Sequence, residues 1–344
     1  MSKIPIANIY YLLCYAWNIL PECTATNINS LDIKKPVDLF ARLLINGTNH
    51  VLRRGIDQSY VDKEEDTASL KGRIDFAGST RRMLHLQGRM RCEFDEISAN
   101  ITTNQIVKAT LLSLSKNQEL DRGLRRSCSL MVKKLHNIED VRLMPNSFHR
   151  VQLSGNNRFY RFLINVCELI FRSSLIDKKT GNYKFRDFLR DERQMAKLYE
   201  KFIFNFYRRE QSTYRVSSDR IRWQAESDTD KDLSLLPSML TDISLRSLNR
   251  TIIIDAKYYS NTLQSNYSSE TISSNNLYQI YAYLKNLEFQ GGNDANADGI
   301  LLYPVIDQHL EHSYHIDEHQ ISIMTLDLSS EWDEIEAQLL DLVA

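Results

Sequence analysis

The sequence lacks several features that would assign it to a functional class at once. Its 43 basic and 44 acidic side chains nearly cancel, so no overall positive field indicates a nucleic-acid-binding protein. Its five cysteines show no C-x-x-C spacing, which argues against a zinc or disulfide framework and for reduced thiols that fill the core. No G-x-x-x-x-G-K-[S/T] pattern occurs, so the chain has no P-loop, and a partner must supply any nucleoside-triphosphate motor.

Long apolar runs are missing as well. The run from Ile9 to Trp17 is too short to span a membrane, and no signal-peptide pattern precedes residue 20. We therefore expect a cytoplasmic protein that does not enter membranes. With 344 residues and 42% hydrophobic content, the chain is long enough for a large core and for two domains.

One stretch, residues 241–259, places three charged groups at informative positions. Thr251 to Ile254 is β-branched and apolar, as in a buried strand, and it ends in Asp255-Ala-Lys257. Alternate residues of a strand share a face, so Asp255 and Lys257 lie on the same face, about 7 Å apart. A turn near residues 247–249 would form a hairpin that brings Asp242 beside Asp255.

Two carboxylates and a lysine at one end of a sheet suit phosphodiester hydrolysis. Mg²⁺ is typically held by one or two carboxylates together with substrate phosphate oxygens, and an adjacent lysine can orient a water molecule. The alternative interpretation is a surface ion pair at a strand end, because the D-x-K pattern is common.

Two further segments contribute polar residues to this interpretation. Gln279 and Tyr283 are four residues apart and therefore lie on one helix face, which is either part of the site or a buried polar face. Glu200 lies in an amphipathic helix that precedes the sheet, where it is either an additional acid of the site or a helix-surface residue.

These segments resemble the PD-(D/E)xK nuclease superfamily. Residues 237–242 match its first half-motif, Asp255-Ala-Lys257 matches its second, and Gln279 with Tyr283 is similar to the Q-x-x-x-Y element of its RecB-like branch. The resemblance implies that Asp242 and Asp255 are metal ligands and that Lys257 orients the attacking water. It also implies that Gln279 and Tyr283 support the site or contact the DNA backbone, and that Glu200 is an additional metal-proximal acid.

A wider resemblance covers most of the chain. The segments that carry it are residues 8–17, 71–76, 235–243, 255–259 and 276–279. Together they look like the McrC family, the nuclease subunit of the McrBC modification-dependent (5-methylcytosine) restriction system. This implies a Mg²⁺-dependent endonuclease that acts on double-stranded DNA containing modified cytosine. It further implies a McrB-type AAA+ GTPase hexamer as partner, stimulated by the N-terminal region through its central pore, and a second copy of the chain for cutting both strands.

The expected fold is α/β with two domains. Residues 1–155 form an N-terminal mixed α+β domain that binds the partner, and residues 156–344 form a restriction-endonuclease-like domain with a mixed central sheet flanked by helices. The boundary rests on the small polar residues at 153–157. We expect Asp62 to Asp66 to be a solvated loop, and Ser260 to Asn276 to be a mobile loop that closes on DNA.

Two alternative functions and one alternative metal site also need to be considered. The rival functions are a non-catalytic activator of the AAA+ ring and a stand-alone repair nuclease of the RecB-like type. The alternative metal site is a zinc site built from His309, His312, His315 and His319. We reject zinc, because His312 and His315 face opposite ways on a strand and no cysteine lies nearby.

Overall fold

The computed structural model divides the chain into two compact units, which we describe separately: Met1–Asp32 with Asp187–Ala344, and Ile33–Arg186. The residues that it describes are 4–18, 33, 35–149, 151, 158–176, 183–185, 191–227, 233, 235–259, 264–266, 269–306 and 308–344. This division differs from the boundary expected near residue 155. Residues 1–32 belong with the C-terminal unit, and residues 156–186 belong with the other.

The unit Ile33–Arg186 has a helical base. Its helices are α3 (Pro36–Arg54), α5 (Thr102–Lys116), α6 (Arg122–Lys134), α7 (Pro145–His149) and α8 (Arg158–Ser173), followed by the strand pair β4 (Ser174–Ile176) and β5 (Tyr183–Phe185). The apolar side of α8 packs on α3 and α5, which explains why this helix belongs here. Gly47 permits the close approach, because a Cβ at that position would lie 2.4 Å from Leu163 Cδ2.

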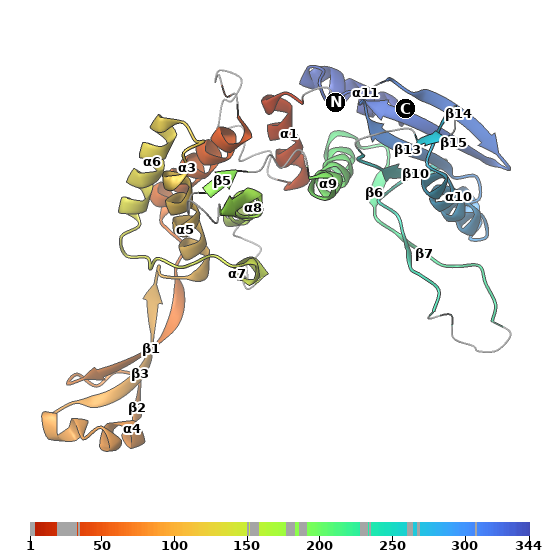
Figure 1. The fold of residues 1–344 in the computed structure, drawn as a ribbon. Helices are drawn as coiled ribbons and strands as arrows, with labels where there is room; N and C mark the ends of the chain where they lie inside the picture. Colours follow the sequence, from red (N-terminus) through yellow and green to blue (C-terminus); the bar gives the residue numbers. More distant parts are fainter. Residues whose placement is uncertain are drawn as a thin grey trace. The chain divides into compact units, whose positions relative to one another are not determined.

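A three-stranded ribbon projects from this helical base (Figure 1). It consists of β1 (Ser59–Thr67), β2 (Arg73–Asp75) and β3 (Met90–Ser98) in the order β1-β3-β2, with α4 (Phe76–Arg81) and the short 3-10 helix η1 (Leu84–Gln87) at its far end. The prediction of a solvated loop at Asp62–Asp66 is wrong, because these residues lie within β1. They pair with β3 along its length, and Lys63 forms a diagonal ion pair with Glu96 of β3 at 2.7 Å.

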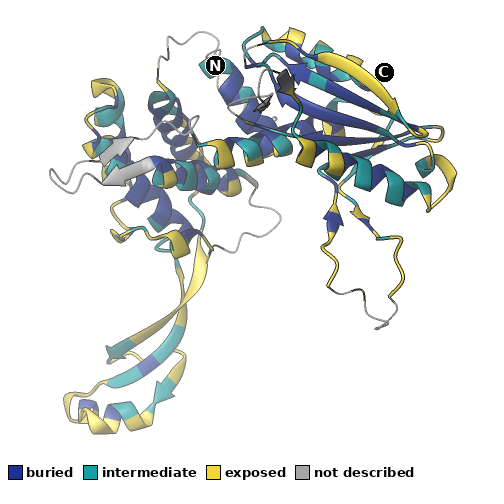
Figure 2. Cartoon of the chain, turned by 45° about the vertical axis from the view of Figure 1, so that its right-hand side comes forward, coloured by how far each residue is buried: buried dark blue, intermediate teal, exposed yellow. Residues whose placement is uncertain are grey.

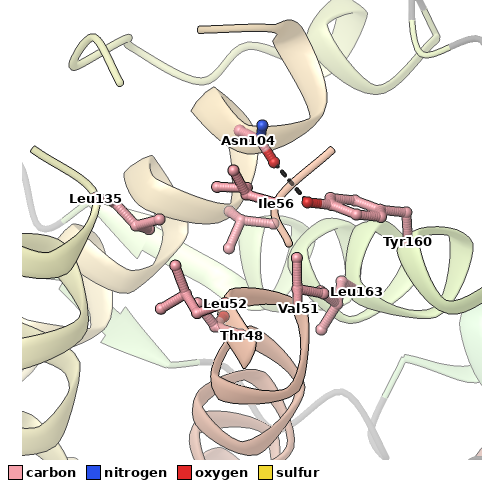
Figure 3. A pocket seen from close by; sticks show the side chains of 9 residues that line it. Thr48, Val51, Leu52, Ile56, Asn104, Leu135, Tyr160 and Leu163 are labelled. Carbon is pink, nitrogen blue, oxygen red and sulfur yellow. Dashed lines mark hydrogen bonds between the residues drawn. The ribbon is translucent and has the colours of Figure 1, made fainter. Parts of the chain in front are cut away.

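Both ends of the ribbon are fastened by one buried amide. Asn104 Nδ2 donates to Asp57 O (2.9 Å) before β1 and to Ala99 O (2.7 Å) after β3. Asn104 Oδ1 accepts from the Tyr160 hydroxyl (2.9 Å), which in turn accepts from Asp57 N (2.9 Å). Figure 3 shows Asn104 and Tyr160 beside a small pocket lined mainly by apolar side chains such as Val51. We call this cluster of Asp57, Ala99, Asn104 and Tyr160 the root network.

The other unit is built on a six-stranded mixed sheet, as predicted. The strand order is β14-β15-β13-β10-β9-β6, with β10, β13 and β15 parallel and the others antiparallel. The strands are β6 (Arg215–Ser217), β9 (Ile243–Arg246), β10 (Thr251–Ala256), β13 (Asp298–Pro304), β14 (Glu311–Ile316) and β15 (His319–Leu326). Figure 2 shows the central strands as buried and β14 as an exposed edge.

Helices cover this sheet. They are α9 (Glu192–Glu210), α10 (Ser274–Glu288) and α11 (Trp332–Asp341), whereas α1 (Ile6–Ala16) packs on α9. Ile253 packs among residues of α10, whereas Tyr258 packs against the Tyr199 ring of α9, so the two helices lie on opposite faces of β10. Helix α1 packs on α9 through the Tyr15 and Phe202 rings, which explains why the N-terminal segment belongs to this unit.

Two short strand pairs and a 3-10 helix complete the unit. They are β7 (Arg220–Ile221) with β8 (Met239–Leu240), β11 (Gln264–Asn266) with β12 (Ser269–Thr271), and η3 (Gly292–Asp294). The predicted loop from Ser260 to Asn276 is thus partly structured, since it contains β11 and β12 and the start of α10. Residues 260–263 and 267–268, where that prediction also falls, lie outside the described residues.

The sequence predicts neither a membrane-spanning helix nor a disulfide framework, and the described part of the chain bears on both predictions. Within it, no helix is long and apolar enough to cross a membrane. Cys14, Cys92, Cys128 and Cys167 are buried and form no disulfide among the described residues, whereas Cys23 lies outside them.

Candidate active site

The predicted hairpin brings Asp242 to Asp255. Ser247 N donates to Arg250 O (2.9 Å) to close the turn, and the register pairs Ile254 with Ile243. Asp242 therefore lies directly before β9, next to the end of β10. Its Oδ2 accepts a hydrogen bond from Ala256 N (3.1 Å), which fixes this carboxylate beside the D-x-K segment.

Asp255 is a buried acid with unused hydrogen-bonding capacity. Its exposure is 0%, and neither carboxylate oxygen accepts a hydrogen bond from any residue that the structure describes. Burial raises the pKa of Asp255 to about 7; the Lys257 ammonium opposes this shift and the Asp242 carboxylate adds to it. The Lys257 ammonium compensates this charge at Oδ1, whereas Oδ2 has no hydrogen-bond partner among the described residues, so Oδ2 and the Asp242 carboxylate can take a further positive ligand.

Lys257 lies between the acids and α10. Its Nζ is 2.9 Å from Asp255 Oδ1, an ion pair without hydrogen-bond geometry, and it donates to Gln279 Oε1 (3.2 Å). Burial alone would lower the pKa of Lys257, but the Asp255 carboxylate outweighs it and the pKa is raised overall. The side chain is therefore a cation at neutral pH and acts as a hydrogen-bond donor rather than as a base.

Gln279 and Tyr283 form a hydrogen-bonded chain on one face of α10. Gln279 Nε2 donates to the Tyr283 hydroxyl (2.7 Å), and that hydroxyl donates to Leu240 O (3.0 Å), two residues before Asp242. Because Gln279 also accepts from Lys257, the chain links the lysine to the strand that carries the first acid. The structure thus brings these two predicted residues to the site.

Glu200 of α9 lies within electrostatic reach of the site but makes no described contact with the acids. Its pKa is raised by burial and then by the Asp242 carboxylate. In the described part of the chain, no three His, Cys, Asp or Glu side chains are grouped to hold a metal, so the protein provides the Asp242 and Asp255 pair rather than a closed cage. For a Mg²⁺ ion that also takes substrate oxygens, two carboxylates are sufficient.

The four histidines weighed as a zinc site do not converge on one point. His312 and His315 lie in β14 three positions apart, and their side chains point to opposite faces of the sheet. His319 is buried, with Nδ1 2.9 Å from Ala297 O and Nε2 3.5 Å from Glu288 Oε2. His309 Nδ1 is 3.0 Å from Thr325 Oγ1.

Sequence reasoning missed three residues near the site. Asn276 Nδ2 donates to the Tyr303 hydroxyl (3.0 Å), and the Tyr259 hydroxyl donates to Asn276 Oδ1 (3.4 Å). Burial raises the pKa of Tyr303, and the Asp255 carboxylate adds to that shift. Tyr259 and Asn276 stand within segments 255–259 and 276–279 that carry the family resemblance, which was a usable signal. Nothing in the sequence marks Tyr303.

A separate cavity of about 390 Å³ lies farther along α10. It is bordered by Arg246 and Leu287, among other residues. Arg246 forms ion pairs with Asp219 and with Asp294 (3.0 Å), so its charge is compensated. This cavity contains none of the residues of the carboxylate site.

Comparisons with known proteins agree with the resemblance. Residues 7–304 match a family model described as McrBC 5-methylcytosine restriction system component. A curated protein of Escherichia coli (strain K12), the type IV methyl-directed restriction enzyme EcoKMcrBC, is 36% identical over 340 residues, which cover 98% of this chain and 97% of that protein. A solved structure from Thermococcus gammatolerans, a half-complex of McrB AAA+ hexamers with bound McrC, matches with a TM-score of 0.58 at 17% identity. The match covers 100% of this chain and 77% of that chain, and it concerns the fold alone.

Proposed function

Because the chain belongs to the McrC family of McrBC 5-methylcytosine restriction system components, we propose that it is the Mg²⁺-dependent endonuclease subunit of such a system. It hydrolyses the phosphodiester bonds of double-stranded DNA that contains modified cytosine. The observation that carries this proposal is the meeting of Asp242, Asp255 and Lys257 at one end of the sheet, with Asp255 Oδ2 left without a hydrogen-bond partner among the described residues.

The residues present fit a Mg²⁺ ion. Asp255 is buried with Oδ2 unpartnered among the described residues, and Asp242 lies beside it, so the pair supplies hard oxygen ligands for a hard cation. When bound, Mg²⁺ would supply charge stabilisation for the phosphate and a water of lowered pKa. Asp242 and Asp255 would hold the ion, and Glu200 would act as an additional acid near it.

The protein's own groups divide the remaining tasks. Lys257 is cationic, so it donates hydrogen bonds to the attacking water or to a phosphate oxygen and neutralises charge. Gln279 holds the ammonium by accepting one of its protons, and Tyr283 fastens this support to Leu240. The site thereby orients a donor and two acids before substrate arrives, which is what electrostatic preorganisation requires.

The partner is a McrB-type AAA+ GTPase hexamer. The support comes from the family, from a related fold solved with bound McrB hexamers, and from the absence of a P-loop in this sequence. The β1-β3-β2 ribbon is the contact element, because its far end exposes the large apolar side chains Leu70, Phe76, Met83 and Leu86. A second copy of the chain would allow both DNA strands to be cut, and the complex would act in the cytoplasm.

Two other functions account for less of the structure. A non-catalytic activator of the ring would have no use for two acids and a lysine clustered at the end of a sheet, with one acid buried. A stand-alone RecB-like nuclease would have no use for the projecting ribbon.

The test combines the chain with its cognate GTPase, Mg²⁺ and GTP, and compares cleavage of methylated and unmethylated plasmid DNA. We expect cleavage of methylated DNA only, and none with Lys257→Ala. Charge reversal of Lys71 and Arg73 on the ribbon should reduce GTPase stimulation, because a reversed contact charge repels the partner. If the wild-type complex hydrolyses GTP but never cuts methylated DNA, the nuclease function is excluded and the non-catalytic activator role is supported.

A further inference from the structure

Tyr259 occupies an unusual position two residues after Lys257. Its neighbour Tyr258 is buried and packs edge-on against the Tyr199 ring, with centroids 5.9 Å apart, on the α9 side. Tyr259 faces the other way and contacts Asn276 of α10. It is therefore on the same side as Lys257 and Gln279, and 40% of it is exposed.

The hydroxyl of Tyr259 is held weakly. Its hydrogen bond to Asn276 Oδ1 is 3.4 Å long, well beyond the usual O–H···O distance of about 2.7–2.8 Å. A phosphate oxygen is a stronger acceptor than an amide oxygen, since charge-assisted hydrogen bonds are shorter and stronger. If a phosphodiester reached Lys257, one of its oxygens could replace Asn276 Oδ1 as the acceptor of the Tyr259 hydroxyl hydrogen bond.

Behind Tyr259 lies a buried polar pair. Asn276 is 4% exposed and Tyr303 is 1% exposed, and Asn276 Nδ2 donates to the Tyr303 hydroxyl (3.0 Å). The Tyr259 and Tyr303 rings are 6.5 Å apart. Buried polar groups cost free energy unless they are hydrogen-bonded, so this pair holds the Asn276 amide in one orientation with Oδ1 toward Tyr259.

We propose that Tyr259 contacts the DNA at the site by donating its hydroxyl hydrogen bond to a phosphate oxygen next to Lys257, and that Asn276 and Tyr303 position it. This assignment rests on the proposed nuclease function and adds a substrate contact to it. It also gives a role to Tyr259 and Asn276, two residues of segments 255–259 and 276–279 to which the proposed nuclease function assigns none.

The test measures two quantities for each variant of the full-length chain. One is the DNA dependence of cleavage in the complete system with GTPase partner, Mg²⁺ and GTP. The other is binding of a fluorescent DNA duplex by the chain in Ca²⁺, without cleavage. The main variant is Tyr259→Phe, which keeps the ring and removes the hydroxyl. Tyr258→Phe is the matched control on the opposite face, and Tyr278→Phe is an exposed control on α10.

Tyr259→Phe should reduce kcat/KM for cleavage by about 10- to 100-fold, because a hydrogen bond to a charged group is lost. It should also weaken duplex binding, while thermal unfolding stays as in the wild type. Both controls should match the wild type. Asn276→Ala, or the milder Tyr303→Phe, should produce a smaller loss in the wild-type background and no further loss when combined with Tyr259→Phe, because they act through that hydroxyl.

Each outcome decides the inference separately from the nuclease function. If the wild type cuts and Tyr259→Phe cuts and binds equally well, the contact is refuted and the nuclease function stands. If the wild type never cuts but Tyr259→Phe selectively weakens duplex binding, the contact stands and the nuclease function fails. A chain that neither binds nor cuts DNA overturns both, and an additive loss in the double variant removes Asn276 and Tyr303 from the positioning role.

Discussion

The two units each contain a buried polar network, and the networks differ in how completely they are satisfied. In the root network, the Asn104 amide donates to two carbonyl oxygens and accepts from Tyr160, which accepts from Asp57 N. At the carboxylate site, Asp255 is as deeply buried, but only Oδ1 faces a described partner, the Lys257 ammonium at 2.9 Å, and Oδ2 has none among the described residues. A satisfied network fixes a structure, whereas an unsatisfied charge is a cost that a ligand can remove.

The difference also separates neutral from ionisable groups. The root network uses an amide and a phenol, and its geometry does not depend on an acid's charge state. The carboxylate site places an acid, a second acid and an ammonium within one cluster, so burial and neighbouring charge shift their pKa values. Groups with such shifts are frequent at functional sites, and here the shift coincides with incomplete hydrogen bonding.

The largest expected effect comes from removing the charges of the carboxylate site. Lys257→Ala, Asp255→Ala or Asp242→Ala should lower DNA cleavage by at least about 10²- to 10³-fold, because each removes a metal ligand or the water-orienting donor. Binding to the GTPase and stimulation of GTP hydrolysis should remain nearly intact. The measurement is plasmid cleavage alongside GTP turnover in the same reaction. Cleavage near the wild-type rate in the Asp255 or Lys257 variant would exclude the nuclease assignment.

Separating the two units is the next strongest test. A fragment of residues 33–186 should unfold cooperatively, because it keeps α8 packed on α3 and α5, and it should raise the partner's GTP turnover without cutting DNA. A fragment of residues 1–155 should be much less stable, since it loses α8 and retains α1 without α9. Circular dichroism against temperature compares them. Equal stability of the two fragments would contradict the division of the chain seen in the structure.

Disrupting the root network should destabilise the unit that carries the ribbon. Asn104→Ala removes the side-chain donor to Asp57 O, one of the donors to Ala99 O and the acceptor of the Tyr160 hydroxyl, at a cost of about 1–3 kcal/mol in the free energy of unfolding. Hydrogen exchange at residues 57–60 and 98–100 should accelerate, and GTPase stimulation should fall. Gln105→Ala is the control, because the described hydrogen bond of its side-chain amide is a single one, to Asn100 Oδ1 (2.9 Å). An unchanged exchange rate in Asn104→Ala would show that the ribbon is fastened elsewhere.

The contrast between the networks also explains what the sequence could predict. The carboxylate hairpin is local: a β-branched run, a turn and a D-x-K pattern lie within 19 residues of one another, so periodicity alone places Asp242 beside Asp255. Gln279 and Tyr283 follow from helical spacing in the same way. The family resemblance then assigned roles that no local pattern carries.

What the sequence did not reveal depends on long-range contacts. Asn104 bonds to Asp57 and Tyr160 across 47 and 56 positions, and nothing marks an asparagine that fastens two strand ends. Asp62 to Asp66 reads as a loop because its residues are charged, yet it forms a strand through pairing with β3. The unit boundary was misplaced for the same reason, since the packing of α1 on α9 spans most of the chain.

The buried acid should make stability depend on pH. The pKa of Asp255 is about 7 in the folded state against an ordinary value of 3.8, so the folded state binds this proton more tightly. The resulting stabilisation is complete below pH 3.8 and is lost as pH rises through about 7, a change on the order of a few kcal/mol without metal. Thermal unfolding in a chelator should therefore show this loss between about pH 4 and pH 7.

Asp255→Asn is the control for this titration. It should flatten the pH dependence in that range, although the unpaired Lys257 ammonium lowers stability at every pH. Mg²⁺ should raise the unfolding temperature of the wild type at pH 8 and not that of Asp255→Asn. An equally steep pH dependence in Asp255→Asn would assign the titration to another group.

The smallest expected effect concerns Glu200, an ionisable residue near the carboxylate site that makes no described contact with its acids. It is half-buried on α9, and its pKa is raised by burial and by the Asp242 carboxylate, yet it touches neither acid of the pair in any described contact. Glu200→Gln should slow cleavage by about 10-fold and raise the Mg²⁺ concentration needed for half-maximal rate, the lower end of the effect of an outer acid, because Glu200 reaches the site only through its charge. A Mg²⁺ titration of cleavage measures both quantities, with Glu192→Gln at the exposed start of the same helix as control. If the Glu200 and Glu192 variants titrate identically with the wild type, Glu200 is a residue of the helix face, and the metal site consists of Asp242 and Asp255 alone.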